Sequence, residues 1–592
     1  MKTRQAWVHV VGMCSVLMAG GALAEDAPAH ATPTPATTAP APAALTAATH
    51  PVDVARIDRA IEARVAGGQF MGSVLIARDG KTLLSKGYGK ASLADNLPNT
   101  PATKFRLGSV TKQFTAASIL LLEERGKLKL EDPIKKYMPD APAAWDSITF
   151  FYLLTHTAGI PNFTSFPEYP STESVAQTPT QVVARFRDKP LNFPPGSSWE
   201  YSNSGYVLLG YLIEKISGQT YAQFVHDNLF APLGMKDSGY DSSTEKIERH
   251  AVGYAPGPGG PVVASYIDMT IPFSAGALYS TTQDMLRWEQ ALFGGKVLKP
   301  SSFAKMTTPF KNNYAMGLGV MTAPNGSKVI SHNGGIEGFN TNVTYVTPEK
   351  LSIIVLANLN GPAADELSAD IRKVANGEPV VLSNERKVTP IPADALNRFV
   401  GTYRVETGQS YVITRVDDHL RASGGPQPIE LYPQSATEFF AKGSDVQVAF
   451  EGDAQGSVTG GTLTMRGQKI PLTHVSAADA QQQAEALAKK IREQTPTPGS
   501  DAAVRRTLED LAAGKPDYEK LGAALGAAVK QQLPVMQPTI QRLGAIKTIE
   551  FKGVGPAGGD IYNVAFENGK LEVRIILDAD GKVVGEGVRP LP

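Results

Sequence analysis

The pattern of apolar residues along the chain changes from short runs to a helical spacing and back again. Short apolar runs at residues 73–76 and 82–85 flank Asp79-Gly80, a pair that is typical of a tight hairpin turn. From about residue 130 to residue 310 the pattern indicates mixed helix and loop. Strand-like runs then return at residues 317–321, 329–332, 342–346 and 351–356. Strands therefore bracket a largely helical insert.

One helix is predicted directly after Ser109. Its apolar positions recur at intervals of four and three residues, at Val110, Phe114, Ala117 and Leu121. This spacing places them on one face, so we expect a single buried stripe, and Gly126 ends the helix. An antiparallel sheet closed by strands from both ends of the domain, with helices packed on it, gives an α+β fold.

Two smaller units follow. After a break at residues 376–392, residues 399–474 show short alternating runs separated by Gly, Asp and Pro, which predicts a small β-barrel. A second break, at residues 494–500, precedes helical patterns and three strand-like runs, which predict a small α+β domain. We place the three domains at residues 51–385, 393–475 and 500–592.

The first 24 residues predict a secretory signal. Lys2 and Arg4 precede a mostly apolar segment, and residues 22–24, Ala-Leu-Ala, offer a cleavage site. The apolar segment is too short to span a bilayer, so we expect no stable membrane insertion after cleavage. Residues 25–50 consist mostly of Ala, Pro and Thr, which predicts a disordered linker. These features favour an exported protein, periplasmic or secreted.

Composition narrows the classes of function. The chain has 592 residues and equal numbers of basic and acidic residues, 57 of each, so charge gives no reason to expect a nucleic-acid partner. The single cysteine, Cys14, lies within the predicted signal, so core burial must stabilise the mature protein. The nine histidines are scattered, and no dinucleotide or P-loop motif occurs, so we expect neither a metal nor another cofactor. Nothing in the sequence specifies an oligomeric state.

Ser109 and Lys112 form a Ser-x-x-Lys pair at the start of the predicted helix. Serine is a weak nucleophile until a base takes its proton. A lysine one helical turn away lies on the same face and can be that base if burial lowers its pKa. The same spacing occurs twice more, at Ser243/Lys246 and Ser302/Lys305. We expect the first of these pairs in a solvated loop and the second in the cap of a surface helix, so Ser109 is the candidate nucleophile.

Two further motifs add polar groups. The phenol of Tyr201 can shuttle a proton if a neighbouring cation lowers its pKa, and the Asn203 amide can hold a substrate amide or the lysine. His332 is expected to donate toward the substrate, and to set an acid limb of kcat/KM near its ordinary pKa of about 6.5. Gly334 and Gly335 let a carbonyl approach the backbone N–H groups. Each motif alone is also compatible with an ordinary buried Tyr or a histidine at the end of a strand.

Together these residues resemble the β-lactamase-related serine hydrolase family, which includes class C β-lactamases, D-Ala-D-Ala carboxypeptidases, D-aminopeptidases and esterases. The resemblance spans residues 52–359 and implies a β-lactamase/transpeptidase-like fold. Further matching stretches lie at residues 153–159, 195–196, 201–218, 232–235 and 280–284. Residues 401–403, Gly-Thr-Tyr, resemble the lipocalin-like barrel of some peptidase-type relatives, in which the barrel limits access to the active site.

The resemblance implies a role for each candidate residue. Ser109 would be the acylated nucleophile, and Lys112 and Tyr201 would share the role of base. Asn203 would orient the substrate. The backbone N–H groups of Ser109 and Gly335 would form the oxyanion hole.

His332 would stand where many members carry the lysine of Lys-Thr-Gly. No Lys-[Ser/Thr]-Gly occurs in this chain. A charged ammonium suits the carboxylate of a β-lactam or of a C-terminal D-alanine, whereas histidine is mostly neutral at pH 7. The histidine form resembles esterase-like and peptidase-like members more than dedicated lactamases.

We therefore predict an exported serine hydrolase that acts through an acyl-enzyme on a small ester, an amide or a peptide, including cell-wall-type peptides, with weak β-lactam hydrolysis at most. Two alternatives are a catalytically silent binding or sensor protein on the same fold and a true class C-like β-lactamase. A third is a structural scaffold built from the two C-terminal domains. The intact motif residues Ser109, Lys112, Tyr201 and His332 argue against the silent protein.

Overall fold

The computed structural model describes residues 50–591, apart from short gaps at 167, 258–259, 324, 406–408, 425–427, 443, 445, 454–455, 466–467, 556–557 and 579. The predicted signal and nearly all of the predicted linker lie outside the described residues. Among the described residues, the structure has no helix with the length and apolar character needed to cross a membrane.

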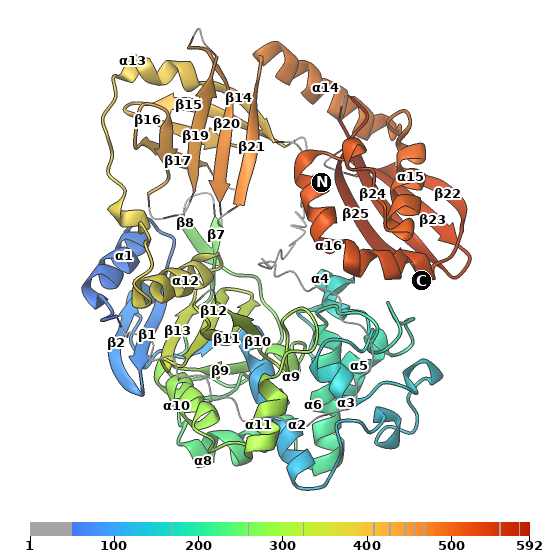
Figure 1. Cartoon of the computed structure of the whole chain (residues 1–592). Helices are drawn as coiled ribbons and strands as arrows, with labels where there is room; N and C mark the ends of the chain where they lie inside the picture. The colour runs from blue at the N-terminus through green and yellow to red at the C-terminus, as the bar shows by residue number, and fades with distance from the viewer. Residues whose placement is uncertain are drawn as a thin grey trace, which may run out of the picture. The chain divides into compact units, whose positions relative to one another are not determined.

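A six-stranded antiparallel sheet organises the first domain (Figure 1). Its order is β10-β11-β12-β13-β1-β2, so strands from the two ends of the domain meet where β1 pairs with β13. This confirms the predicted sheet. The strands span Gly72–Arg78 (β1), Lys81–Tyr88 (β2), Gly319–Thr322 (β10), Lys328–Ile336 (β11), Phe339–Thr347 (β12) and Leu351–Ala357 (β13).

The N-terminal hairpin takes the turn that its sequence favours. Asp79 and Gly80 adopt positive φ angles of 46° and 76°, as a two-residue turn between twisted strands requires. The two faces of β1 are both buried. Leu75 and Ala77 face the larger apolar cluster, and Val74 and Ile76 face the smaller one. The central strand therefore contributes to two cores.

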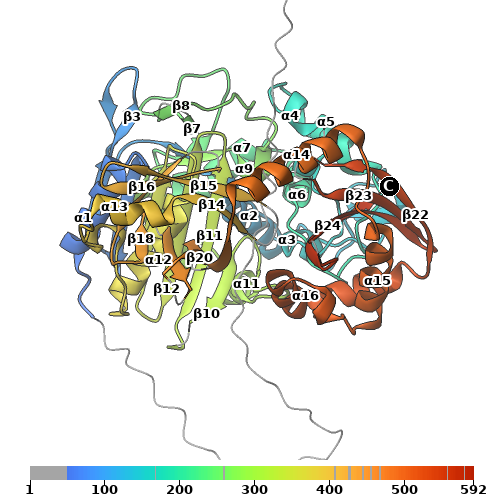
Figure 2. The ribbon, with the colours of Figure 1, turned by 90° about the horizontal axis from the view of Figure 1, so that it is seen from above.

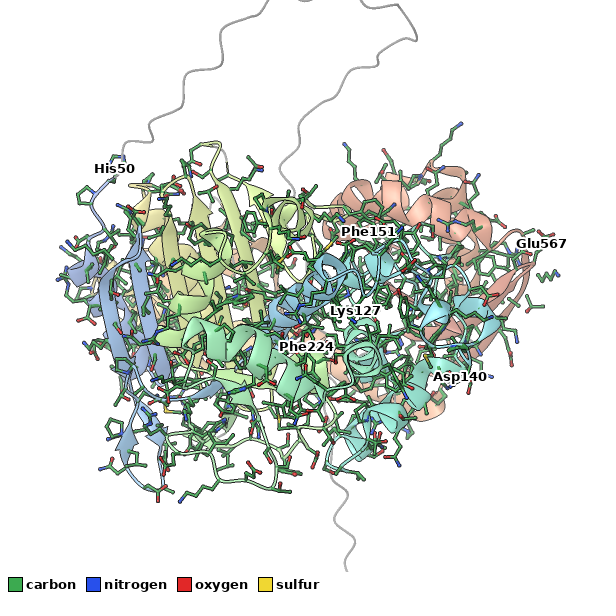
Figure 3. All side chains as sticks on the ribbon, turned by 90° about the horizontal axis from the view of Figure 1, so that it is seen from below. His50, Lys127, Asp140, Phe151, Phe224 and Glu567 are labelled. Atoms are coloured by element: carbon green, nitrogen blue, oxygen red, sulfur yellow. The ribbon has the colours of Figure 1, made fainter. Side chains whose placement is uncertain are left out.

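Helices cover both faces of the sheet. On one face, α1 (Val54–Ala66) and α12 (Ala363–Ala375) enclose the smaller cluster. On the other face lie α10 (Thr282–Phe293) and the helical insert, and Figure 2 shows α2 (Thr111–Glu124) between the sheet and α6 (Asn203–Ser217). Figure 3 labels Lys127, which lies exposed just beyond the end of α2.

Helix α2 is buried on all sides, which differs from the predicted single stripe. Every residue from Thr111 to Leu120 is buried, polar ones included. The reason is that α2 is the central helix, in contact with α6, α9 (Phe273–Gly276) and α11 (Pro300–Thr307), and it shares an apolar cluster with residues of the sheet.

The second unit is a closed eight-stranded antiparallel barrel, as predicted. Its interior is an apolar core that includes Phe399, Tyr403, Leu420 and Phe439. The strands span Gly401–Val405 (β14), Ser410–Val416 (β15), His419–Ser423 (β16), Ile429–Pro433 (β17), Glu438–Phe440 (β18), Gln447–Gly452 (β19), Val458–Met465 (β20) and Gln468–Val475 (β21).

The third unit is a four-stranded antiparallel sheet with helices, in agreement with the predicted α+β domain. Its elements are α15 (Ser500–Ala513), α16 (Ala523–Arg542), β22 (Ile546–Val554), β23 (Asp560–Phe566), β24 (Gly569–Leu577) and β25 (Val583–Leu591). Strand β25 and the preceding helix α14 (Ala477–Glu493) were not predicted. An ion pair of 2.8 Å between Lys490 Nζ and Asp560 Oδ1 joins α14 to this sheet.

Candidate active site

Ser109 lies in a single 3-10 turn, Gly108–Val110, immediately before α2. Gly108 has a φ of 53°, and a Cβ built on it would lie 3.0 Å from the Gly335 nitrogen. The Thr341 hydroxyl donates to the Leu107 carbonyl at 2.8 Å and fixes the same turn. A residue without a side chain at position 108 therefore lets the serine turn pack directly against β11.

The neighbouring stretch of β11 has a free edge. Strand β10 pairs with β11 only over Lys328–Ser331, so among the described residues no strand pairs with residues 332–336 on that side. A Cβ on Gly334 would lie 2.0 Å from the Leu107 carbonyl oxygen, which explains why this position also carries glycine. The structure thus brings Gly335 beside the serine turn, and the unpaired backbone next to Ser109 can pair with the main chain of an extended substrate.

Lys112 is completely buried and lies at the centre of the site. Its Nζ is 3.0 Å from Ser109 Oγ, 2.8 Å from Asn203 Oδ1 and 2.9 Å from the Ala275 carbonyl oxygen. Burial lowers the pKa of this amine well below its usual value. A neutral amine has two N–H groups and one lone pair. Because the amide and carbonyl oxygens can only accept, they take the two N–H groups and leave the lone pair for the serine hydroxyl.

Tyr201 also lies beside the serine. Burial raises the pKa of this phenol above its ordinary value, and a hydrogen bond with Ser109 offsets part of that rise. The Lys112 Nζ lies 4.8 Å from the centre of the Tyr201 ring. The expectation that a neighbouring cation lowers this pKa is therefore wrong, because burial raises the pKa of the phenol and disfavours the charged form of Lys112 as well.

Asn203 is the first residue of α6, and both polar atoms of its amide contact protein groups. Its Oδ1 accepts from Lys112, and its Nδ2 donates to Thr164 Oγ1 at 3.1 Å. Of the two interactions considered for this amide, the structure contains the one with the lysine.

His332 is 7% exposed and differs from expectation in its hydrogen bonds. Its Nδ1 lies 2.6 Å from the Asn333 carbonyl oxygen, which can only accept, so the ring proton is on Nδ1. The Tyr314 hydroxyl then donates to His332 Nε2 at 3.0 Å. Both nitrogens are engaged, so the ring does not donate toward a substrate. Burial and nearby Lys112 lower the pKa of His332 to about 3, which removes it as the source of an acid limb near pH 6.5.

Three residues that contact the site belong to none of the motifs from which the site was predicted. Tyr206, Tyr314 and His156 surround Tyr201 and Lys112 with aromatic rings, and the Tyr206 ring lies 5.5 Å from Lys112 Nζ. Tyr206 and His156 fall within the stretches that match the family, but nothing in their spacing indicated a contact with the lysine. These rings exclude water from Lys112 and so contribute to its low pKa.

The other two Ser-x-x-Lys pairs do not form such a site. Ser243 Oγ accepts from the Met269 N–H at 3.0 Å in a loop. Ser302 is buried within α11, where Lys299 and not Ser302 is the cap residue, and Lys305 pairs with Glu123 at 2.9 Å. Among the described residues, no three or more His, Cys, Asp or Glu side chains are arranged to hold a metal ion.

Comparison with known proteins gives matches over most of the chain. A model of the family described as beta-lactamase matches residues 57–376, and a model of a domain of unknown function (DUF3471) matches residues 385–483. Penicillin-binding protein 4* of Bacillus subtilis (strain 168) is 29% identical over 412 residues, which cover 64% of this chain and 90% of that protein. The putative penicillin-binding protein PbpX of the same organism is 33% identical over 311 residues, 52% of this chain and 76% of that protein.

A solved structure shares the fold. The octameric penicillin-binding protein homologue from Pyrococcus abyssi superposes with a TM-score of 0.53 at 24% identity, covering 71% of this chain and all of that one.

Proposed function

The chain belongs to the beta-lactamase family and is a serine hydrolase, and from this premise we propose that it is an exported enzyme in which Ser109 forms an acyl-enzyme with an uncharged amide, peptide or ester. The observation that carries the proposal is the buried Lys112 amine, held 3.0 Å from the serine hydroxyl by Asn203 and the Ala275 carbonyl. A free amine in that position is a base at neutral pH.

The acylation step follows from this arrangement. Lys112 takes the hydroxyl proton of Ser109, and the serine Oγ forms a bond to the substrate carbonyl carbon. The backbone N–H groups of Ser109 and Gly335 hold the resulting oxyanion. The C–N or C–O bond to the leaving group then breaks and the carbonyl reforms as the serine ester.

Tyr201 completes the proton transfer. Its phenol is protonated, because burial raises its pKa, so it acts as the acid that protonates the departing amine or alkoxide. The proton that Lys112 holds then returns to the phenolate. In deacylation a water molecule takes the place of the leaving group and the same transfers run in reverse.

The position at which many family members carry the lysine of Lys-Thr-Gly favours substrates without a carboxylate beside the scissile bond. His332 is neutral and both its nitrogens are occupied. The next residue, Asn333, donates to Asp365 at 3.2 Å, as does Asn342 at 2.7 Å. A neutral ring does not attract a carboxylate, and the neighbouring Asp365 adds no positive charge. Because two relatives are named as penicillin-binding proteins, we propose that β-lactams acylate the serine weakly and slowly.

Export rests on the N-terminal sequence alone. Lys2, Arg4 and the Ala-Leu-Ala at residues 22–24 favour cleavage after Ala24. Expression of the full chain followed by N-terminal sequencing of the extracytoplasmic fraction should give a mature protein that begins at Glu25. Recovery of the uncleaved chain from the cytoplasm would contradict this part of the proposal.

The enzyme is tested with a fluorophosphonate probe and mass spectrometry, together with hydrolysis of nitrophenyl esters and amino-acid amides. We expect one adduct, on Ser109, and loss of turnover by several orders of magnitude in Ser109→Ala. Ser243→Ala is the matched control, because it lies in the same kind of motif, and it should label and turn over normally. An adduct elsewhere, or normal turnover in Ser109→Ala, would contradict the assignment of the nucleophile.

A further inference from the structure

Tyr201 lies on a segment that has no regular structure of its own. Helix α5 ends at Arg187 and α6 begins at Asn203, and the residues between them form neither helix nor strand. A proton donor must stay within about 2.6–3.2 Å of the atom that it serves. Some other part of the domain therefore has to hold this phenol in place.

The turn after α3 (Phe150–Leu154) holds the segment through its carbonyl groups. The Asn192 N–H donates to the Gly159 carbonyl at 2.8 Å, and the Gly196 N–H donates to the Thr157 carbonyl at 2.7 Å. Closest to the tyrosine, the Glu200 N–H donates to the carbonyl of His156 at 3.0 Å.

The His156 side chain makes the matching contact on the other side of Tyr201. The Ser202 N–H donates to His156 Nδ1 at 3.2 Å, so the two neighbours of Tyr201 in the chain are both bound by one residue. The ring is 3% exposed, and its centre lies 4.4 Å from the centre of the Tyr201 ring. His156 thus contacts the backbone on each side of Tyr201 and the face of its ring.

The protonation state of His156 suits this contact. Burial, together with Lys112 and His332, lowers the pKa of the imidazole well below its ordinary value. The ring therefore stays neutral, and its Nδ1 keeps the lone pair that accepts from Ser202. The backbone of His156 takes a φ of 58°, in the left-handed region that histidine and asparagine enter more readily than other residues.

We infer that His156 is a positioning residue for Tyr201. It binds the backbone N–H groups of Glu200 and Ser202, the two neighbours of Tyr201 in the chain. The inference rests on the proposed function, in which Tyr201 transfers the leaving-group proton. His156 does not touch the reacting atoms. It acts by fixing the distance between the phenol and Ser109.

Two variants at position 156 separate positioning from simple packing. In His156→Asn, the side-chain oxygen can accept from the Ser202 N–H, and asparagine tolerates the positive φ. In His156→Leu, the acceptor is lost while an apolar side chain fills the space. We expect His156→Asn to keep kcat/KM within about threefold, and His156→Leu to lower it by about 10- to 100-fold through misplacement of the phenol. His156→Ala is the second acceptor-free variant if leucine prevents folding.

The decisive measurement is a double-mutant cycle with Tyr201→Phe. If His156 acts through the phenol, His156→Leu should change kcat/KM by less than about threefold once the hydroxyl is gone. An equal loss of kcat/KM from His156→Leu in wild type and in Tyr201→Phe would overturn the inference. Equal losses of kcat/KM in His156→Asn and His156→Leu, with unchanged thermal unfolding, would overturn it as well. Wild-type rates in Tyr201→Phe alone would instead contradict the proposed role of Tyr201. Labelling of Ser109 in every variant reports whether the nucleophile itself is intact.

Discussion

The chemistry of this molecule depends on the surroundings of one amine. Lys112 has no exposed surface, and its hydrogen-bond partners include no carboxylate. Desolvation therefore acts on its pKa without a compensating negative charge, and the amine stays free to accept a proton. Because the proposed mechanism requires the neutral amine, kcat/KM should rise with pH through the lowered pKa of Lys112 and reach its plateau well below the ordinary lysine range.

The charge beside this amine can be changed at a single residue, Asn203. Asn203→Asp places a carboxylate about one hydrogen bond from Nζ, which favours the ammonium form and raises the pKa of Lys112. We expect the acid limb of kcat/KM to move to higher pH, with lower activity at pH 7. Thr164→Val is the control, because it removes the hydrogen bond to Asn203 Nδ2 and leaves the contact with the lysine. An unchanged acid limb in Asn203→Asp would mean that another group sets it.

Specificity is tested at His332. His332→Lys introduces a cation on the leaving-group side, whereas His332→Gln changes the shape of the residue without adding charge. A charge-assisted hydrogen bond to a substrate carboxylate should raise kcat/KM for penicillins, relative to nitrophenyl esters, by about tenfold in the lysine variant only. Equal ratios in the two variants would show that charge at this position does not select the substrate.

At the scale of elements, the site is a junction between a turn and a strand edge. The turn before α2 meets β11 with no side chain between them, because Gly108 and Gly334 are both in backbone contact with the opposing segment. The proposed oxyanion hole uses the backbone N–H groups of Ser109 and Gly335, which lie on different elements, so its geometry would depend on that contact.

Gly108→Ala tests this junction, with Gly126→Ala as its matched control. The two glycines have similar φ angles, 53° and 69°, but nothing lies within 4 Å of a Cβ at position 126. Both variants should lower stability by about 1–2 kcal/mol, because alanine is strained at positive φ. Only Gly108→Ala should also lose turnover, by about 100-fold, because the strand must move away from Ser109. Equal turnover in the two variants, measured beside their thermal unfolding, would show that the junction tolerates a methyl group.

The sequence predicts those elements whose residue pattern is local, and it misses contacts that depend on tertiary packing. The hairpin at Asp79-Gly80 and the strands of the sheet carry local patterns, and the structure confirms them. Helix α14 was missed because it contains only two large apolar residues, Leu487 and Ile491, and so shows little apolar periodicity. The contacts of His156 and Tyr314 depend on tertiary packing, and no spacing along the chain reveals them.

At the scale of the molecule, the apolar cores are separate. The clusters of the first domain contain residues between Ile57 and Leu382, the barrel core runs from Leu396 to Leu472, and the third core from Ala503 to Val583. None of the buried residues that define one core belongs to another. Each unit therefore has an apolar core of its own, which is what an independently folding domain requires.

This separation gives a prediction for a shortened chain. A protein consisting of residues 50–390 should fold cooperatively, give one adduct with a fluorophosphonate on Ser109 and hydrolyse small esters at rates near those of the full chain. Calorimetry of the full chain should show more than one transition. A shortened chain that folds but does not label would mean that the barrel or the third domain contributes to the site.

The pairing of β1 with β13 also bears on how the enzyme comes into being. Residues 72–78 can pair in the sheet with residues 351–357 only after the latter have been synthesised. Such long-range pairing makes folding slow. The serine turn is synthesised early, but the strand that faces it, β11, follows more than 200 residues later. A ribosome-bound chain that still lacks β11 therefore has no complete site, and hydrolysis begins only when the whole first domain has been made and folded.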